Sequence, residues 1–232
     1  MSKVVLITGA RKGIGLAMCN HYLSKGYYVC GCSRKESDLE HENYHHYKVD
    51  VSHETEIIKM VRNIKKTHKR IDVLINNAGK ASMNHLSLTP ISTVDSIFDT
   101  NFKGTFLLTR EVSKLMVRKR YGRIVNLSSI AVPLNLEGEA AYASSKAAIE
   151  CFTKISAKEL SPFNITVNVI GPTPIETDLI KNVPGKKINS LIENQGIKRM
   201  GKVSDVLNVV DFFISDQSDF ITGQTIYLGG VV

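Results

Sequence analysis

A phenol and an amine lie four residues apart at Tyr142 and Lys146. If residues 140–160 form a helix, positions i and i+4 share one face, so the two side chains become neighbours. A phenol keeps its proton up to about pH 10, but a cation beside it favours the phenolate and lowers its pKa. General acid–base catalysis needs a group that titrates near the working pH. The pair is therefore a candidate catalytic centre, although the same spacing also arises by chance on solvated helices.

A glycine-rich turn follows the first apolar run, where residues 8–15 read Thr-Gly-Ala-Arg-Lys-Gly-Ile-Gly. Glycines permit a tight turn and let backbone N–H groups approach a phosphate at a helix N-terminus. A strand precedes this turn and a helical pattern follows it, which is the context that a dinucleotide-binding motif requires. The spacing is Gly-x-x-x-Gly-x-Gly. We expect a dinucleotide to bind here, and a plain strand–helix turn is the alternative.

The end of the second expected strand carries Ser33, Arg34 and Lys35. A carboxylate at this place would bind the adenosine ribose and repel a 2′-phosphate. Ser33 is small and neutral, whereas Arg34 can form a fork with a phosphate. Arg11 and Lys12 of the glycine turn add positive charge from the other side. The sequence therefore favours NADP(H) over NAD(H), unless Arg34 and Lys35 are only solvated loop residues.

Polar residues also follow the next three expected strands. Asp50 precedes Val51 after the third strand, and its carboxylate could accept a hydrogen bond from an adenine amine or cap a helix. Residues 76–79 (Asn-Asn-Ala-Gly) close the fourth strand, where amides can bind a cofactor or hold neighbouring strands together. Ser128 and Ser129 follow the fifth. Ligands of open parallel sheets gather beyond the carboxyl ends of strands, although either serine could be a turn residue.

Asn101 lies inside a long helical pattern at residues 91–119, although Asn is a poor helix former in a helix interior. We interpret it as the mark of a bent turn, with water bound to the freed backbone.

The candidate site residues lie among short β-branched runs that alternate with longer amphipathic segments. This pattern is typical of parallel strands joined by helices, which would position the site. The expected strands are 4–8, 28–32, 44–49, 73–76, 122–127, 166–170 and 225–228, and the expected helices are 14–25, 54–66, 91–119, 141–161 and 205–214. The central strands are almost continuously apolar, as in a sheet that helices cover on both faces. We predict one α/β domain over residues 1–232, a Rossmann-like doubly wound parallel sheet of about seven strands.

Residues 172–201 depart from this alternation, because they are polar and hold three of the six prolines. Long connections without regular structure are usually functional lids or disordered segments. We expect a substrate lid here.

Length and composition fit this picture. A chain of 232 residues suits one large domain, and 43% hydrophobic with 22% charged residues is an ordinary globular balance. The apolar runs are too short for a transmembrane helix or a signal peptide. The four cysteines lack a Cys-x-x-Cys spacing. We expect a reduced, cytoplasmic protein with no membrane partner.

The net charge of +8 raises the question of a nucleic-acid partner. Basic residues are spread along the chain, with modest clusters at 65–70, 118–123 and 186–187. The first two clusters lie at expected helix ends, where cations suit the helix dipole. Neither a zinc-finger spacing nor a basic–aromatic pattern is present. We expect no nucleic-acid partner and no metal site, and we assign the charge to solvated helix ends and an anionic substrate or cofactor.

Together these residues resemble the short-chain dehydrogenase/reductase family over nearly the whole chain. Residues 8–15 match the cofactor loop Thr-Gly-x-x-x-Gly-x-Gly of that family, and residues 76–79 match its Asn-Asn-Ala-Gly motif. The residues that match its catalytic tetrad are Asn101, Ser129, Tyr142 and Lys146. The spacing of 13 residues between serine and tyrosine selects Ser129 over Ser128.

The resemblance implies a reaction in which NADPH gives a hydride to a carbonyl carbon and Tyr142 gives its proton to the developing alkoxide. It further implies that Ser129 stabilises the carbonyl oxygen, that Lys146 lowers the pKa of the tyrosine and holds the nicotinamide ribose, and that Asn101 anchors a proton-relaying water. The expected cofactor contacts are Thr8, Gly9, Arg11, Lys12, Gly13, Ile14, Gly15, Ser33, Arg34, Asp50, Val51, Asn77, Ala78, Gly79, Tyr142, Lys146, Pro172, Thr173 and Thr177.

Two positions depart from the family pattern. Thr173 stands where a glycine is common after the sixth strand, so the backbone beside the nicotinamide carboxamide could run differently. Thr177 still matches a threonine that contacts that carboxamide. Gly229 and Gly230 lack the aspartate that commonly precedes the paired glycines.

Among family members, the chain looks most like 3-oxoacyl-(acyl-carrier-protein) reductases. A basic surface would help it to meet an acidic carrier protein, and residues 118–120 lie where such enzymes carry basic docking residues. The turn at 161–164 lacks a basic residue that they often have. A polyketide, sugar or small ketone as substrate, and a cofactor-binding sensor or scaffold without catalysis, are the alternatives. The resemblance also implies a homotetramer or homodimer.

Overall fold

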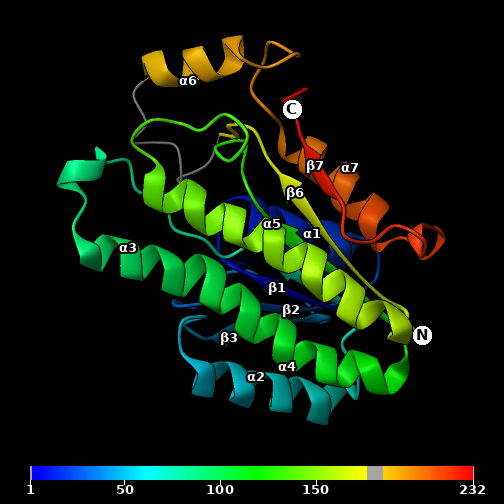
Figure 1. The fold of residues 1–232 in the computed structure, drawn as a ribbon. Coiled ribbons are helices and arrows are strands. Elements are labelled where there is room, and N and C mark those ends of the chain that lie inside the picture. Colours follow the sequence, from blue (N-terminus) through cyan, green and yellow to red (C-terminus); the bar gives the residue numbers. More distant parts are fainter. Residues whose placement is uncertain (1, 177–184, 232) are drawn as a thin grey trace.

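Each strand of the sheet forms from one of the short apolar runs. The computed structural model describes residues 2–176 and 185–231. The strands are β1 (Val4–Thr8), β2 (Tyr28–Ser33), β3 (Tyr44–Lys48), β4 (Val73–Asn76), β5 (Gly122–Leu127), β6 (Ile165–Gly171) and β7 (Thr225–Tyr227). The helices are α1 (Gly13–Ser24), α2 (Glu54–His68), α3 (Ile91–Phe98), α4 (Gly104–Lys119), α5 (Ala140–Leu160), α6 (Gly185–Glu193) and α7 (Val203–Ile214) (Figure 1).

The strands form one parallel sheet in the order β3-β2-β1-β4-β5-β6-β7. The predicted seven-stranded, doubly wound sheet is therefore confirmed. The chain leaves β1 towards β2 and β3 and then returns to place β4 on the other side of β1. This reversal creates the crevice at the carboxyl ends of the strands in which such sheets bind ligands.

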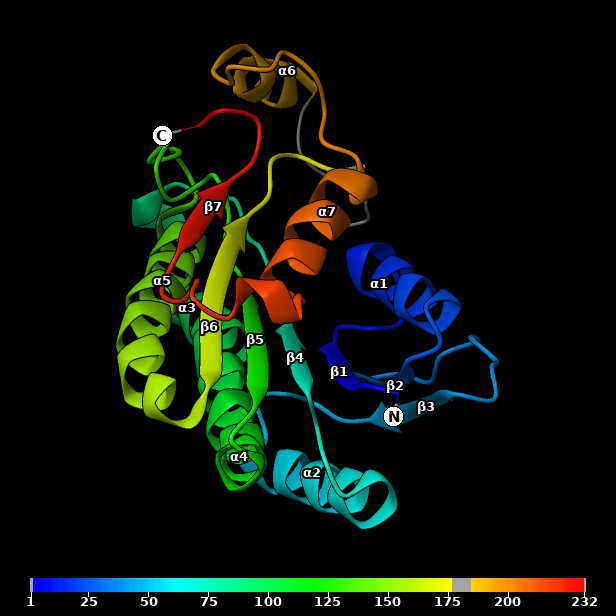
Figure 2. The same cartoon turned by 90° about the vertical axis from the view of Figure 1, so that its right-hand side faces the viewer.

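Two layers of helices cover the sheet, and each layer closes its own apolar core (Figure 2). Leu6 of β1 packs with α2 and α4, whereas the next residue, Ile7, packs with α1 and α7. This alternation follows from the period of two along a strand. Burial of one such side chain contributes roughly 1.5–3 kcal/mol. In the parts of the chain that are described, no helix has the length and apolar character that a bilayer crossing requires.

The long helix predicted at 91–119 is interrupted. α3 ends at Phe98, one π-helical turn covers Asp99–Lys103, and α4 begins at Gly104. The Thr105 hydroxyl donates to the backbone oxygen of Asn101 at 2.7 Å, which satisfies a carbonyl that the regular ladder would otherwise use. The irregular turn expected at Asn101 is thus present, and π-helical turns of this kind occur mostly at functional sites.

Residues 172–201 contain α6, which the sequence patterns did not predict. α6 lies apart from the two helix layers, at the top of Figure 1. Ile188, Leu191 and Ile192 have the spacing of one helix face, and this signal was available in the sequence. Residues 177–184 lie outside the described residues, and so does the expected cofactor contact at Thr177.

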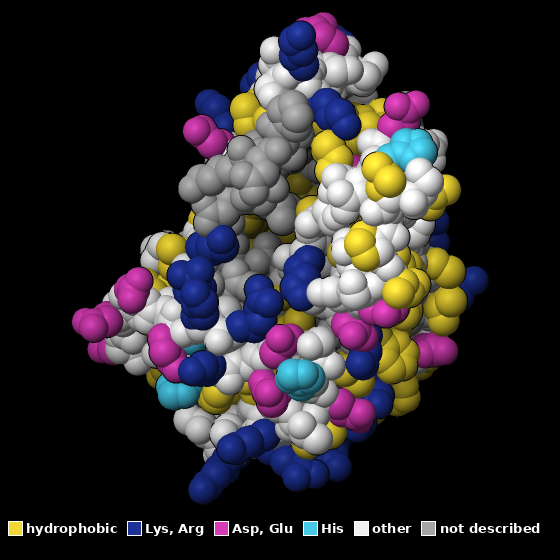
Figure 3. All heavy atoms as spheres, turned by 90° about the vertical axis from the view of Figure 1, so that its left-hand side faces the viewer, with side chains coloured by type: hydrophobic (Ala, Val, Ile, Leu, Met, Phe, Trp, Pro, Cys, Tyr) yellow, Lys and Arg dark blue, Asp and Glu magenta, His cyan; other side chains and the backbone are white. Residues whose placement is uncertain are grey.

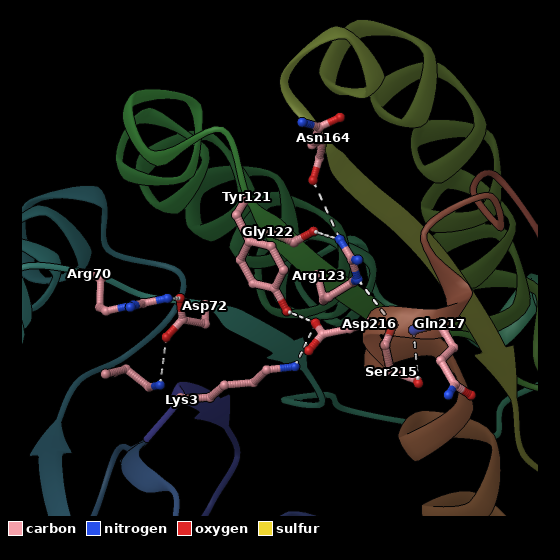
Figure 4. Close-up of polar contacts among 11 residues, drawn as sticks. Lys3, Arg70, Asp72, Tyr121, Gly122, Arg123, Asn164, Ser215, Asp216 and Gln217 are labelled. Atoms are coloured by element: carbon pink, nitrogen blue, oxygen red, sulfur yellow. Dashed lines mark hydrogen bonds and ion pairs between the residues drawn. The ribbon is translucent and has the colours of Figure 1, made fainter. Parts of the chain in front are cut away.

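The amino ends of β1, β4 and β5 are joined by a polar cluster far from the crevice (Figure 4). Asp216 accepts hydrogen bonds from Lys3 and from the Tyr121 hydroxyl, each at 2.8 Å. The Arg123 guanidinium lies 4.8 Å from the centroid of the Tyr121 ring. The backbone N–H of Val4 donates to the buried carboxylate of Asp72 at 2.8 Å. These contacts connect the strands to the end of α7 and leave the opposite edge of the sheet for the site.

Candidate active site

The carboxyl ends of β1, β4 and β5 bring the predicted chemistry to one edge of the sheet. Tyr142 and Lys146 lie on the first turns of α5, and both are buried. The Lys146 Nζ atom is 5.8 Å from the centroid of the Tyr142 ring. The side chain of Ser129, just beyond β5, lies close enough to the Tyr142 hydroxyl to lower its pKa. Three of the four predicted tetrad residues are therefore neighbours.

The pKa of Tyr142 moves in the opposite direction from the sequence prediction. Burial raises it to about 12, and the charge of Glu139 adds to the rise, while the nearby Ser129 side chain lowers it. Burial also lowers the pKa of Lys146 to about 8. The prediction considered only the attraction between phenolate and ammonium, but both groups are buried, and burial disfavours each charged form. Near neutral pH the phenol keeps its proton.

Lys146 is held at the end of β5. Its ammonium donates to the backbone oxygen of Leu127 at 2.8 Å. A Cβ atom added to Gly79 would lie 3.5 Å from the Lys146 Nζ atom and 3.5 Å from Asn101 Oδ1. Gly79 thus keeps the space next to both groups free of a side chain.

Asn101 connects helix α5 with the loop after β4. Its amide nitrogen donates to the backbone oxygen of Lys80 and to Ser145 Oγ, both at 2.9 Å, and its amide oxygen accepts from the Lys80 N–H at 2.8 Å. Ser145 Oγ in turn donates to the backbone oxygen of Tyr142 at 2.7 Å. The amide of Asn101 is therefore committed to fixing α5 against the loop after β4. Ser145 is not among the predicted site residues, although its position three residues after Tyr142 indicates the same helix face.

Ser128 and Ser129 have separate partners. The Ser128 hydroxyl donates to the Glu150 carboxylate, which also accepts from the Tyr227 hydroxyl at 2.7 Å. Ser129 Oγ accepts from the Ala131 N–H at 3.1 Å and faces Tyr142. Ser129, which the family spacing selects, is the serine beside the phenol.

The turn at residues 9–15, called the glycine cradle below, has a backbone path that requires glycine at three positions. Gly9 has a φ of +66° and Gly13 a φ of +57°, a region that other residues rarely adopt. A Cβ atom on Gly15 would lie 2.3 Å from the backbone oxygen of Gly9. The turn opens α1, where backbone N–H groups favour an anion. This cradle fits a nicotinamide dinucleotide, whose phosphate groups the backbone N–H groups at the start of α1 would bind.

Asn76 and Asn77 hold the ends of β1, β4 and β5 together. The Asn76 amide donates to Asn126 Oδ1 at 2.8 Å, and the Asn77 amide donates to the backbone oxygen of Thr8 at 2.8 Å. Thr8 Oγ1 accepts from the backbone N–H groups of Asn77 and Ala78. Of the two roles that the sequence left open for these amides, the structure shows strand cohesion.

The end of β2 is arranged around a histidine that is absent from the predictions. Ser33 Oγ lies 3.0 Å from His46 Nε2 and 2.6 Å from the backbone oxygen of Lys35, to which it donates. Burial lowers the pKa of His46, and the positive charge of Arg11 adds to this shift. Arg11 therefore lies near the same edge, and the Arg34 side chain there is exposed. His46 pairs with Gly31 of β2, two residues before Ser33, so the side chains of His46 and Ser33 lie on the same face of the sheet.

Asp50 forms a local turn. Its carboxylate accepts from the backbone N–H and the hydroxyl of Ser52, at 3.0 and 2.7 Å. Burial alone would raise the pKa of Asp50, but these bonds and the charges of His53 and Arg34 hold it below its usual value. The next residue, Val51, buries its side chain against Gly104. If Val51 contacts a cofactor, it therefore does so through its backbone.

Two of the remaining predicted contacts, Pro172 and Thr173, lie at the end of β6. The Pro172 oxygen accepts from the Ile130 N–H at 3.3 Å. Thr173 is buried, and its hydroxyl has no hydrogen-bond partner in the described ranges. Ile14 of α1 packs against the core next to α7. On the face of the molecule towards which the strands run, Lys and Arg side chains gather about a hollow (Figure 3).

The fold, the glycine cradle and the buried tyrosine define a class of dinucleotide-dependent oxidoreductases with a doubly wound sheet. Residues 3–188 match the family model described as short chain dehydrogenase, and the chain belongs to this family. It is 32% identical to a 3-oxoacyl-[acyl-carrier-protein] reductase FabG of Staphylococcus epidermidis, over 99% of this chain and 98% of that protein. An NAD-dependent glycerol dehydrogenase of Listeria innocua is 34% identical, over 98% and 92%. The solved structure of ElxO with NADP bound has a TM-score of 0.90 and 30% identity, over 98% and 97%.

Proposed function

We propose that this protein is an NADP(H)-dependent reductase that converts a ketone into a secondary alcohol, with Tyr142 as the general acid. The observation that carries the proposal is the position of the buried, protonated Tyr142 phenol beside Lys146, with the Ser129 side chain close enough to lower the pKa of Tyr142. Both hydroxyl groups can serve one substrate oxygen, and the glycine cradle lies at the same edge of the sheet.

The residues of this chain share the work of the reaction. When bound, the nicotinamide dinucleotide supplies the hydride that the carbonyl carbon accepts, and it is thereby oxidised. Tyr142 gives its proton to the carbonyl oxygen, and Ser129 donates a hydrogen bond to the same oxygen as negative charge develops. The Lys146 ammonium stabilises the phenolate that remains until a proton returns from solvent. Asn101 holds α5 in place for these transfers.

NADP(H) is preferred over NAD(H) in this proposal. Ser33 leaves room for a 2′-phosphate, and Arg34 and Arg11 supply positive charge at the same edge. ElxO, which binds NADP, supports this choice, whereas the glycerol dehydrogenase uses NAD. The proposed preference for NADP(H) over NAD(H) therefore rests on the residues and charges at the end of β2.

Two substrate classes have support among the relatives, namely 3-oxoacyl thioesters on a carrier protein and polyols. The net charge of +8 would favour an acidic carrier. The proposal includes a cytoplasmic setting and a homotetramer, or homodimer, in which α4 and α5 pack against another copy of the chain.

A carbonyl panel tests the proposal. NADPH oxidation is followed with 3-oxoacyl thioesters, a keto sugar and small ketones, using the wild type and Tyr142→Phe. The variant should lose at least about 10²-fold in kcat, because general acid catalysis typically contributes 10²–10⁴-fold, while its Kd for NADPH stays close to that of the wild type. Tight NADPH binding with no carbonyl reduced would favour a sensor or scaffold. Full activity in Tyr142→Phe would exclude Tyr142 as the acid.

A further inference from the structure

Two buried side chains, one after β6 and one after α6, have polar atoms without a partner. The Thr173 hydroxyl and the Gln195 amide nitrogen make no hydrogen bond within residues 2–176 and 185–231. Thr173 is 6% exposed and Gln195 is 2% exposed. Buried polar atoms of folded proteins are nearly always hydrogen-bonded, so each exception requires an explanation. A ligand that binds both atoms would provide one.

Both side chains line one cavity, whose volume is about 210 Å³. Two glycines of the cavity wall bring them together. A Cβ atom added to Gly229 would clash with Gln195 Oε1 and lie 2.8 Å from Thr173 Cγ2, and a Cβ atom added to Gly201 would lie 2.5 Å from Thr173 Oγ1. One water molecule needs roughly 10–15 Å³ of such a cavity. The cavity can therefore hold a molecule of several heavy atoms.

The cavity lies where the two ends of the connection between β6 and α7 meet. The Gly201 N–H donates to the backbone oxygen of Pro174 at 3.0 Å, and Gly201 also forms a parallel bridge with Ile175. Thr173 belongs to the first end of this connection and Gln195 to the second. A molecule that binds both side chains would therefore join the two ends.

The groups around the cavity favour an anion. The amide nitrogen of Gln195 is only a donor, and the Thr173 hydroxyl can donate as well. The carboxylate of Asp205, on the same wall, is already bound by two guanidinium nitrogens of Arg199 at 2.7 and 3.0 Å. α7 begins at Val203 beside the cavity, and the N-terminus of a helix favours negative charge. The unpaired donors therefore lie in surroundings that suit an anionic acceptor.

We propose that this cavity binds a short-chain monocarboxylate, whose two oxygens accept hydrogen bonds from Gln195 Nε2 and Thr173 Oγ1. Ile197 and Leu228 also line the cavity and offer apolar surface to a short hydrocarbon chain. A phosphate dianion fits less well, because its larger charge costs more to remove from water. The site is additional to the one around Tyr142, and it does not rest on the proposed reductase function.

Butyrate and butyramide test the inference, because they have the same size but differ in charge and in the number of acceptor oxygens. Isothermal titration calorimetry at one ionic strength measures the Kd of each for the wild type and three variants. The wild type should bind butyrate at least about tenfold more tightly than butyramide. Gln195→Met and Thr173→Val each remove one donor at nearly constant size, so each should raise the Kd for butyrate at least about tenfold. Gln217→Met makes the matched change at an exposed residue and should leave that Kd unchanged.

Equal Kd values for butyrate and butyramide in the wild type would overturn the proposal, and so would a butyrate Kd that neither Gln195→Met nor Thr173→Val alters. A wild type that binds no butyrate would overturn it too, since ordered water would then satisfy both side chains. Thr173→Val keeps the test available if Gln195→Met does not fold, and the comparison within the wild type needs no variant. None of these titrations involves a carbonyl substrate or NADPH, so this site and the proposed reductase function can fail independently.

Discussion

At the scale of single residues, burial brings the pKa of Lys146 close to physiological pH. Its pKa is lowered to about 8, so the ammonium is present below that pH and lost above it. Because the cation stabilises the phenolate left by Tyr142, kcat/KM for ketone reduction should be level below about pH 8 and fall about tenfold per pH unit above it. A pH profile of kcat/KM checks this.

Lys146→Arg should move that fall to higher pH, since a guanidinium stays charged throughout. Lys154→Arg, an exposed position on the same helix, serves as the control and should leave the profile unchanged. A wild-type profile that stays level to about pH 9.5 would contradict the assignment, because few Lys146 ammonium groups would remain there.

Arg34→Asp tests the phosphate preference. The substitution replaces a cation by a carboxylate where the 2′-phosphate is expected, so the Kd for NADPH should rise about 10- to 100-fold, or about 1.4–2.8 kcal/mol. The Kd for NADH should change little. Lys35→Asp makes the same change of charge at the next exposed residue and should have a smaller effect. Fluorescence titrations at one ionic strength measure both constants. If Arg34→Asp leaves the ratio of the two Kd values unaltered, Arg34 does not bind the 2′-phosphate of NADPH.

Residue types, spacings and the family resemblance predicted Asn101, Ser129, Tyr142 and Lys146 as a set, and the fold brings them to one edge of the sheet. The direction of the Tyr142 pKa shift was not predictable in this way. It depends on how completely distant segments exclude water from α5, and spacing carries no such information. His46 escaped prediction for a related reason, since its contact with Ser33 exists only through the pairing of β2 with β3.

At the scale of elements, one side-chain oxygen couples the cofactor cradle to the neighbouring strand. Thr8 Oγ1 accepts from the backbone N–H groups of Asn77 and Ala78, at 3.0 and 2.8 Å. Thr8→Val keeps the shape but leaves two N–H groups without their acceptor. The free energy of unfolding should fall by about 1–3 kcal/mol, measured by urea denaturation, and NADPH binding should weaken.

Thr166→Val is the matched control for Thr8→Val. Thr166 is buried in β6, and its hydroxyl has no hydrogen-bond partner among the residues described. Replacing that hydroxyl by a methyl group should be neutral or stabilising. Equal losses in the two variants would mean that the hydrogen bonds of Thr8 do not matter.

The elements differ in how far sequence could define them. β1 and β4 were predicted with their observed bounds, since apolar runs between turn residues fix a buried strand. The helix at 91–119 was predicted as one piece, because amphipathic periodicity passes through a single π-helical turn almost unchanged. α6 was missed, since its three apolar residues lie among polar and charged residues.

At the scale of the whole molecule, the two ends of the parallel strands have different roles. Contacts at the amino ends stabilise the fold, and the carboxyl ends hold the candidate active site. The amino ends of the strands carry the cluster of Lys3, Tyr121, Arg123 and Asp216 (Figure 4). The carboxyl ends carry the glycine cradle and Tyr142. Stabilising contacts at one edge leave the loops of the other edge free to bind ligands. The net charge of +8 belongs to this scale too, because several basic side chains gather beside the hollow at the carboxyl ends (Figure 3).

The outer face of α4 and α5 determines the assembly that we propose. Phe106 of α4 is 41% exposed and Ile155 of α5 is 53% exposed. The Phe106 ring lies 5.5 Å from that of Phe152 and 6.5 Å from that of Phe102, measured between centroids. Exposed aromatic clusters of this kind commonly mark protein interfaces. Another copy of the chain packed on this face would cover the cluster.

Phe106→Glu should therefore break the proposed oligomer. A charge placed in the centre of an apolar interface is left without a partner, so the mass measured by light scattering should fall from that of a tetramer or dimer towards the 25.7 kDa of one chain. Tyr28→Glu is the control, because Tyr28 is 40% exposed and lies on β2, at the other side of the sheet from β5 and β6. It should leave the mass unchanged. A wild-type protein that is monomeric at micromolar concentration, or a Phe106→Glu variant that keeps the full assembly, would rule out this face as the interface.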